Sequence, residues 1–160
     1  MKKLTPGNFV RIPLGEEGFA FGRIIENPLV AFYDFLSPIP DVSLEEIARK
    51  PVAFSIWVYN NAIGRKGWKV IGNLPLEPHL DKEYHFYKKD PITGRLSLYT
   101  DSRDIPATYE DVRSCERAAV WQGYNVEQRL LDHFNGLPNE IVEGFKRQVE
   151  ECRIPESSGK

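Results

Sequence analysis

The sequence predicts one α+β domain in which a strongly bent antiparallel sheet, of the SH3-like or partial-barrel kind, comes first and helices pack after it. Residues 4–100 carry short runs with the apolar-polar alternation of strands, separated by glycines and prolines. Residues 105–153 change to the spacing of three to four that is typical of helices. The length of 160 residues suits a single domain over 1–160, with a frayed tail at 154–160.

Three short strands open the chain. Residues 8–14 alternate, and two glycines then mark a tight turn before a second strand at residues 19–26. Residues 29–35 are apolar on both faces apart from Asp34, which predicts a central strand that is covered on both sides. Burial would raise the pKa of this carboxyl unless a partner such as Arg23, or a backbone donor, holds it charged. The sequence leaves open whether Asp34 is paired or exposed.

The middle of the chain continues the sheet after a short helix. Ser43 and Glu46 have the spacing of a capping box, and Pro51 ends the helix that they begin. Residues 60–67 are a polar loop with two glycines. Further strands are predicted at residues 52–59, 68–74, 84–88 and 96–99, the last two joined as a hairpin by Pro91 and Gly94.

The last third is predicted to be helical. Thr108 is expected to cap one helix, and Asn125 a second helix that Gly136 stops. Pro138 is expected in the first turn of the final helix. The apolar run at residues 118–121 fits either a strand or a helix end.

Composition and charge restrict the class of protein. The chain is 41% hydrophobic, has a formal net charge of −2, and contains no apolar run of the ~18 residues that a membrane span needs. The N-terminus lacks the apolar core of a signal peptide, so we expect a cytoplasmic protein with no membrane partner. Near-neutral charge argues against a nucleic-acid partner. Cys115 and Cys152 are expected to be buried, reduced thiols.

The search for chemistry finds no catalytic pattern. The three histidines, His79, His85 and His133, fall in three different elements without the spacing of a zinc site. No metalloprotease, nucleophile-elbow or phosphate-loop motif is present. We therefore predict no catalytic residues, no metal and no cofactor, and a protein that is not an enzyme.

Several strings resemble the immunity protein 26 family of bacterial polymorphic toxin systems. They lie in order over residues 4–135, and the family's expected Pro-Gly-Asp start is Pro6-Gly7-Asn8 here. The strings include Phe19-Ala20-Phe21-Gly22-Arg23, Leu29-Val30-Ala31-Phe32-Tyr33-Asp34, Trp68-Lys69-Val70-Ile71-Gly72 and Glu116-Arg117-Ala118-Ala119-Val120-Trp121. The motif residues that we assign to the family's fold are Gly22, Arg23, Asp34, Trp68, Gly72, Glu116, Arg117 and Trp121. We expect Trp68, and Trp57 with Trp121, to belong to the core.

The resemblance implies a non-enzymatic antidote that binds a cognate toxin domain and blocks it by stoichiometric protein-protein interaction. We place its contact patch on the polar loop, because large rings, amides and two cations meet there. The same residues also fit a surface hairpin loop without a role in binding, and the sequence leaves both interpretations open. The partner-binding residues that we predict are Tyr59, Asn60, Asn61, Arg65 and Lys66. The alternative is an SH3-like module that binds a nucleic acid or a peptide through its aromatic residues. The sequence leaves the toxin's identity and the oligomeric state open.

Overall fold

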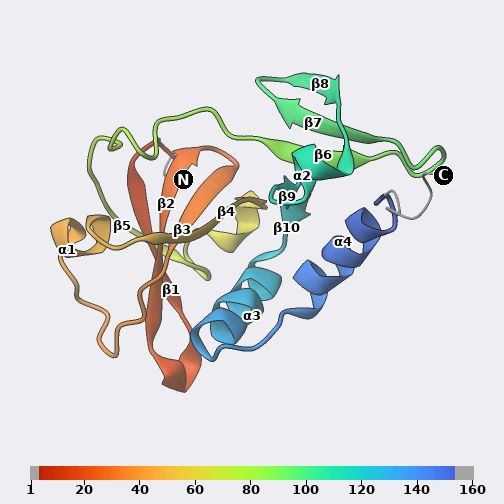
Figure 1. Cartoon of the computed structure of the whole chain (residues 1–160). Helices are drawn as coiled ribbons and strands as arrows, with labels where there is room; N and C mark the ends of the chain where they lie inside the picture. Colours follow the sequence, from red (N-terminus) through yellow and green to blue (C-terminus); the bar gives the residue numbers. More distant parts are fainter. Residues whose placement is uncertain (1–3, 154–160) are drawn as a thin grey trace. The chain divides into compact units, whose positions relative to one another are not determined.

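The computed structural model of the chain describes residues 4–153 and shows two compact units, each with its own sheet (Figure 1). Among the described residues, the first unit consists of residues 4–82 and 119–137, and the second of residues 83–118 and 138–153. The α+β class is therefore confirmed. The single domain stays a prediction, and the predicted frayed tail lies outside the described residues.

The first unit is built on a six-stranded open sheet with the order β10-β4-β3-β2-β1-β5. Its strands are β1 (Asn8–Pro13), β2 (Phe19–Glu26), β3 (Leu29–Tyr33), β4 (Val52–Val58), β5 (Lys69–Asn73) and β10 (Val120–Trp121). Only β10 runs parallel to its neighbour, β4. The connections include the helices α1 (Leu44–Ala48) and α3 (Gly123–Phe134) and the 3-10 turns η1 (Gly15–Glu17) and η2 (Asn60–Ala62).

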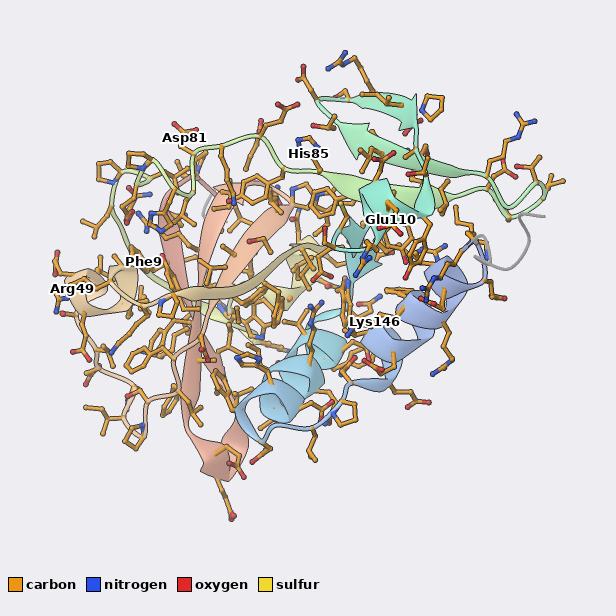
Figure 2. The ribbon with its side chains drawn as sticks, in the orientation of Figure 1. Phe9, Arg49, Asp81, His85, Glu110 and Lys146 are labelled. Atoms are coloured by element: carbon orange, nitrogen blue, oxygen red, sulfur yellow. The ribbon has the colours of Figure 1, made fainter. Side chains whose placement is uncertain are left out.

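The central strands of this sheet, β2 and β3, are buried on both faces, and β3 has no exposed residue. On one face, Ile47 of α1 packs with Phe9, Phe21 and Tyr33. Phe9 lies between α1 and the sheet, whereas Arg49 points outward beyond the end of α1 (Figure 2). Phe32 lies on the opposite face, since neighbouring residues of a strand point to opposite sides. On that face Trp68, just before β5, meets the Phe32 ring edge-on, and Arg129 of α3 lies over the neighbouring Phe54 ring.

The second unit carries a four-stranded sheet with the order β8-β7-β6-β9. Its elements are β6 (Phe86–Lys89), β7 (Leu96–Thr100), β8 (Arg103–Pro106), α2 (Tyr109–Val112), β9 (Glu116–Arg117) and α4 (Glu140–Glu150). A small core consists of Tyr87, Leu96, Val112 and Val149. Cys115 and Cys152 pack against it as free thiols, and both are half-buried rather than fully buried as expected.

Most predicted helices and strands are present, but some of them begin at other residues than the capping patterns in the sequence indicated. The Ser43 hydroxyl accepts the Glu46 amide at 3.2 Å, and Thr108 with Asp111 forms a full capping box. Helix α3, however, begins after Gln122 and not after Asn125, because Gln122 has extended dihedrals and its carbonyl accepts the Val126 amide.

Three further differences have local causes. The last helix begins after Asn139, whose side chain accepts two amides of the first turn, so Pro138 precedes the helix. Strand β8 was missed because its turn uses Asp101 and Ser102 at positive φ instead of glycine. The two parallel strands, β9 and β10, have two residues each and therefore no detectable period.

A membrane-spanning helix is not among the elements found. Throughout residues 4–153, every helix is too short or too polar to cross a bilayer.

Candidate functional site

The predicted contact loop, residues 59–68, is a compact turn that its own backbone holds together. The Ala62 amide donates to the Tyr59 carbonyl at 3.1 Å, and the Trp68 amide donates to the Ala62 carbonyl at 2.8 Å. The Gly64 amide donates to the Trp68 carbonyl at 2.9 Å, which joins the two ends of the loop. Backbone groups that are paired in this way fix the loop's conformation before any partner arrives.

Trp68 anchors this loop in the core. Its ring is 1% exposed and meets the Phe32 ring edge-on at a centroid distance of 5.7 Å. Its indole nitrogen donates to Glu127 of α3 at 2.9 Å. The prediction that Trp68 is a core residue is confirmed.

Two glycines allow the close packing around Ala62 at the centre of the loop. A Cβ on Gly67 would lie 2.1 Å from the Ala62 carbonyl oxygen, and a Cβ on Gly123 would lie 2.9 Å from the Ala62 Cβ. Either added methyl group would force the loop to shift. The start of α3 is thus packed directly on the contact loop.

All five predicted partner-binding residues lie on this loop and are exposed. Tyr59 is 46% exposed, and Asn60, Asn61, Arg65 and Lys66 are also exposed. The loop therefore presents a ring, two amides and two cations on a rigid base. Their role in binding stays a prediction.

Tyr124 is an exposed aromatic residue that the sequence analysis did not select. It is 70% exposed and follows Gly123, the residue whose Cα packs against Ala62. Its position beside the contact loop depends on this packing between segments far apart in the sequence. Nothing in the local sequence indicates it.

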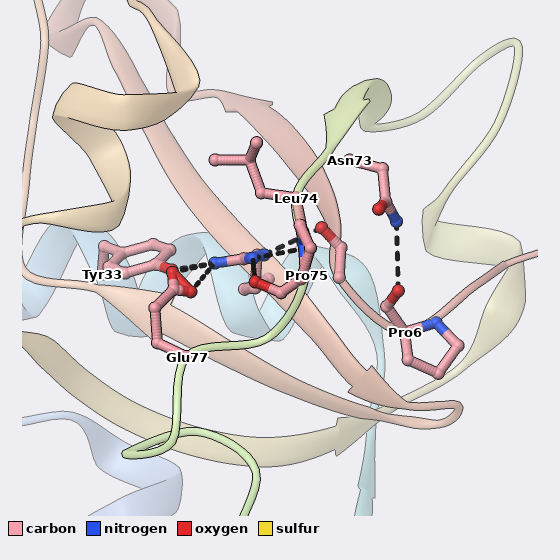
Figure 3. A network of polar contacts seen from close by, with 8 residues as sticks. Pro6, Tyr33, Asn73, Leu74, Pro75 and Glu77 are labelled. Atoms are coloured by element: carbon pink, nitrogen blue, oxygen red, sulfur yellow. Dashed lines mark hydrogen bonds and ion pairs between the residues drawn. The ribbon is translucent and has the colours of Figure 1, made fainter.

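Arg23 forms a buried polar cluster at the other end of β1 (Figure 3). Its side chain is fully buried, and the guanidinium lies 4.0 Å from the centre of the Phe9 ring. All five N–H groups have acceptors: the carbonyls of Gly7 (2.8 Å), Leu74 (2.7 Å) and Pro75 (3.0 Å), the Tyr33 hydroxyl (3.1 Å) and the Glu77 carboxylate (2.9 Å). Arg23 thus fastens the segment after β5 to β1, β2 and β3, which is a structural role.

The charge of Arg23 is balanced by Glu77 and not by Asp34, so the pair of Arg23 with Asp34, one of the alternatives that the sequence offered, is not formed. Burial alone would raise the pKa of Glu77, but the hydrogen bond and the positive charge of Arg23 lower it on balance. Burial raises the pKa of the Tyr33 hydroxyl, which stays neutral as an acceptor for Arg23.

Asp34 lies just past the end of β3, where its side chain is 49% exposed. Its carboxylate lies 2.8 Å from Nε2 of His133 at the end of α3. The apolar neighbours suggested burial, but β3 ends at Tyr33, one residue before Asp34 and two residues before the expected end at residue 35. The Asp34–His133 contact is therefore a surface pair between two elements of the first unit.

The remaining family-motif residues have structural surroundings. A Cβ on Gly22 would lie 3.1 Å from side-chain atoms of both Val10 and Val30, and a Cβ on Gly72 would lie 2.6 Å from Leu44. Trp121 is 4% exposed, which confirms it as a core residue, whereas Trp57, which was expected in the core as well, is only half-buried.

Glu116 and Arg117 belong to the second unit. They form β9, which pairs with Phe86 and Tyr87 of β6. The Arg117 guanidinium lies over the Phe145 ring at 5.1 Å and donates to the Gln148 side chain.

The described residues show no cluster that resembles a metal site. Across residues 4–153, three or more His, Cys, Asp or Glu side chains do not gather in ligand geometry. Burial raises the pKa of the Cys115 thiol, which makes it less reactive than an exposed cysteine.

Comparison with known proteins gives one match. The family model described as Immunity protein 26 matches residues 5–98, more than half of the chain. A search of curated proteins and a search of solved structures each found no match.

Proposed function

The chain belongs to the immunity protein 26 family, and we propose that it is a cytoplasmic antidote that binds one cognate toxin domain and blocks it without turnover. The matched residues contain the whole contact loop and the strands that hold it. The proposed binding surface therefore lies within the residues that match the family model.

The observation that carries this proposal is the rigid, exposed contact loop. Association costs less conformational entropy when the binding groups are already ordered. The loop's backbone bonds and the buried Trp68 provide that order. Aromatic and arginine side chains are the residues that most often dominate a protein interface, and Tyr59 and Arg65 are both exposed on the loop.

A stable complex needs more surface than one loop. Standard interfaces bury about 1,600 Å² in total, or roughly 20–30 residues a side. Tyr124 extends the exposed surface on one side of the loop. We propose that Tyr59 sets the lifetime of the complex, while Arg65 and Lys66 set the association rate and its dependence on salt.

Titration of the toxin's activity tests the proposed function. The toxin is sought as the C-terminal domain of a large secreted protein encoded directly upstream of this chain. We expect inhibition to be complete near ~1 equivalent of this protein and unchanged by a chelator, because binding is stoichiometric.

Protection by far less than one equivalent would contradict the proposal, since it would indicate an enzyme acting on the toxin or its product. The alternative, an SH3-like module for nucleic acid or peptide, is tested by the same protein with a single-stranded oligonucleotide. Tight binding to the oligonucleotide without any effect on the toxin would favour that alternative.

A further inference from the structure

The edge of the sheet next to the contact loop places two cations directly opposite each other. Arg11 of β1 pairs with Lys69, the first residue of β5, in the antiparallel register. Side chains of such a pair project from the same face with Cβ atoms about 4.5–5.5 Å apart, where like charges destabilise the pair. A carboxylate from another molecule, placed between these two cations, would relieve their mutual repulsion.

These two cations continue the positive charge of the contact loop. The ammonium of Lys69 donates to the Arg65 carbonyl at 2.7 Å, which holds Lys69 beside the loop. Residues 59–73 contain Arg65, Lys66 and Lys69 but neither Asp nor Glu. We call Arg11, Arg65, Lys66 and Lys69 the basic edge.

The cations of the basic edge form no ion pair among residues 4–153. The Arg11 guanidinium lies 6.0 Å from the centre of the Phe19 ring. By contrast, Lys88, Lys89, Arg113 and Lys146 each have a carboxylate within 4 Å.

An open hollow of about 520 Å³ adjoins Arg11. Its lining consists of Arg11, Pro40, Asp41, Val42, Ser43, Leu44 and Ile71. Most of these side chains are apolar, and Arg11 is the cation among them. Gly72 lets Leu44 approach β5, because a Cβ there would meet Leu44 at 2.6 Å.

We propose that this edge receives an acidic segment of the partner protein, with a carboxylate between Arg11 and Lys69 and a neighbouring apolar side chain in the hollow. The inference rests on the proposed function, since the partner is the toxin domain, and it adds the chemistry of the segment that docks. Charge complementarity of this kind speeds association and rejects partners of the wrong sign.

The apolar lining favours a protein segment over a nucleic acid. A phosphate backbone would match the cations, but it has no apolar group for Val42, Leu44 and Ile71. An Asp or Glu next to a Leu, Ile or Val satisfies both the cations and the hollow.

The test compares affinities of variants for the upstream-encoded toxin domain at low and high salt. Replacing both Arg11→Gln and Lys69→Gln should weaken binding roughly fivefold to tenfold at low salt and reduce its salt dependence. Asp41→Asn should act in the opposite direction and tighten binding roughly twofold to threefold, because it removes a repulsive charge. Arg95→Gln, an exposed cation in the second unit, is the matched control and should stay within about twofold.

The hollow is tested by Val42→Thr, which keeps the shape and adds a hydroxyl. We expect roughly threefold weaker binding while the protein remains folded by thermal melting. Unchanged affinity in either the double variant or Val42→Thr would overturn the inference, as would weaker binding in Asp41→Asn.

The outcomes separate this inference from the function on which it rests. If the wild-type protein does not bind the toxin domain at all, the proposed function fails. If it binds and the variants bind equally well, only the acidic segment is wrong. Binding of a single-stranded oligonucleotide that is lost in the double variant would assign the edge to nucleic acid instead.

Discussion

A cation lies at each end of β1: one is matched by groups inside the protein, and the other has no ion-pair partner among the described residues. Near its start, Phe9 lies opposite Arg23, whose five N–H groups all have acceptors inside the protein. Near its end, Arg11 lies opposite Lys69, and neither has an ion-pair partner among the described residues. A fully buried charge such as that of Arg23 must be matched within the fold, whereas the half-buried Arg11 and the exposed Lys69 reach solvent and can remain unmatched until a partner binds. The first end therefore serves stability, and we assign the second to recognition.

Of the variants that test this difference, Arg23→Met should lower the free energy of unfolding the most. The variant leaves the Tyr33 hydroxyl and the Gly7 carbonyl without their donor, so we expect a loss of about 3–5 kcal/mol in the free energy of unfolding. Denaturant unfolding measures it. A loss below about 1 kcal/mol would mean that Arg23 does not organise this end of the sheet.

Glu77→Gln should cost less, about 1–2 kcal/mol, because the carboxylate is 30% exposed and glutamine keeps one acceptor. The pKa of Glu77 is lowered by folding from an ordinary value of 4.5, so its contribution is complete above about pH 4.5 and is lost as pH falls toward the folded pKa.

The acid side of the stability profile checks this assignment. Unfolding free energy measured from pH 7 down to pH 3 should fall less steeply in Glu77→Gln than in wild type. Some slope will remain, since the pKa values of Asp90 and Glu150 are also lowered. Identical slopes in the two proteins would contradict the role of Glu77.

Asp34→Asn should have the smallest effect. Its contact with His133 is a surface pair with a 49% exposed carboxylate, so we expect a change within about 0.5 kcal/mol. A thermal melt beside wild type measures it. A loss of several kcal/mol would restore the idea that Asp34 carries a buried charge.

The contrast between Asp34 and Arg23 shows what the sequence could predict. Alternation located the first strands, and the apolar run correctly indicated that β3 is covered on both faces. The partner of Arg23 was not predictable, because Glu77 is 54 residues away in a segment with no regular structure. Neighbouring strands suggested Asp34 instead.

The candidate site was predictable to a similar degree. Glycines and polar residues identified the loop that begins at Tyr59, since they are typical of exposed turns. The pairing of Arg11 with Lys69 could not be predicted from the sequence. A register shift between Phe9 and Val10 changes which residues of β5 face β1. Tyr124 joins the site only through the packing of α3 on the contact loop.

Hydrogen exchange with and without the toxin domain tests the central claim most directly, namely that the contact loop and the basic edge form the docking surface. With ~1 equivalent of toxin bound, the amides of residues 59–73 should exchange more slowly, because a partner shields them from solvent and suppresses local opening. The amides of residues 83–118 should exchange at their free rate. Slower exchange confined to residues 83–118, with residues 59–73 unchanged in a formed complex, would contradict the account.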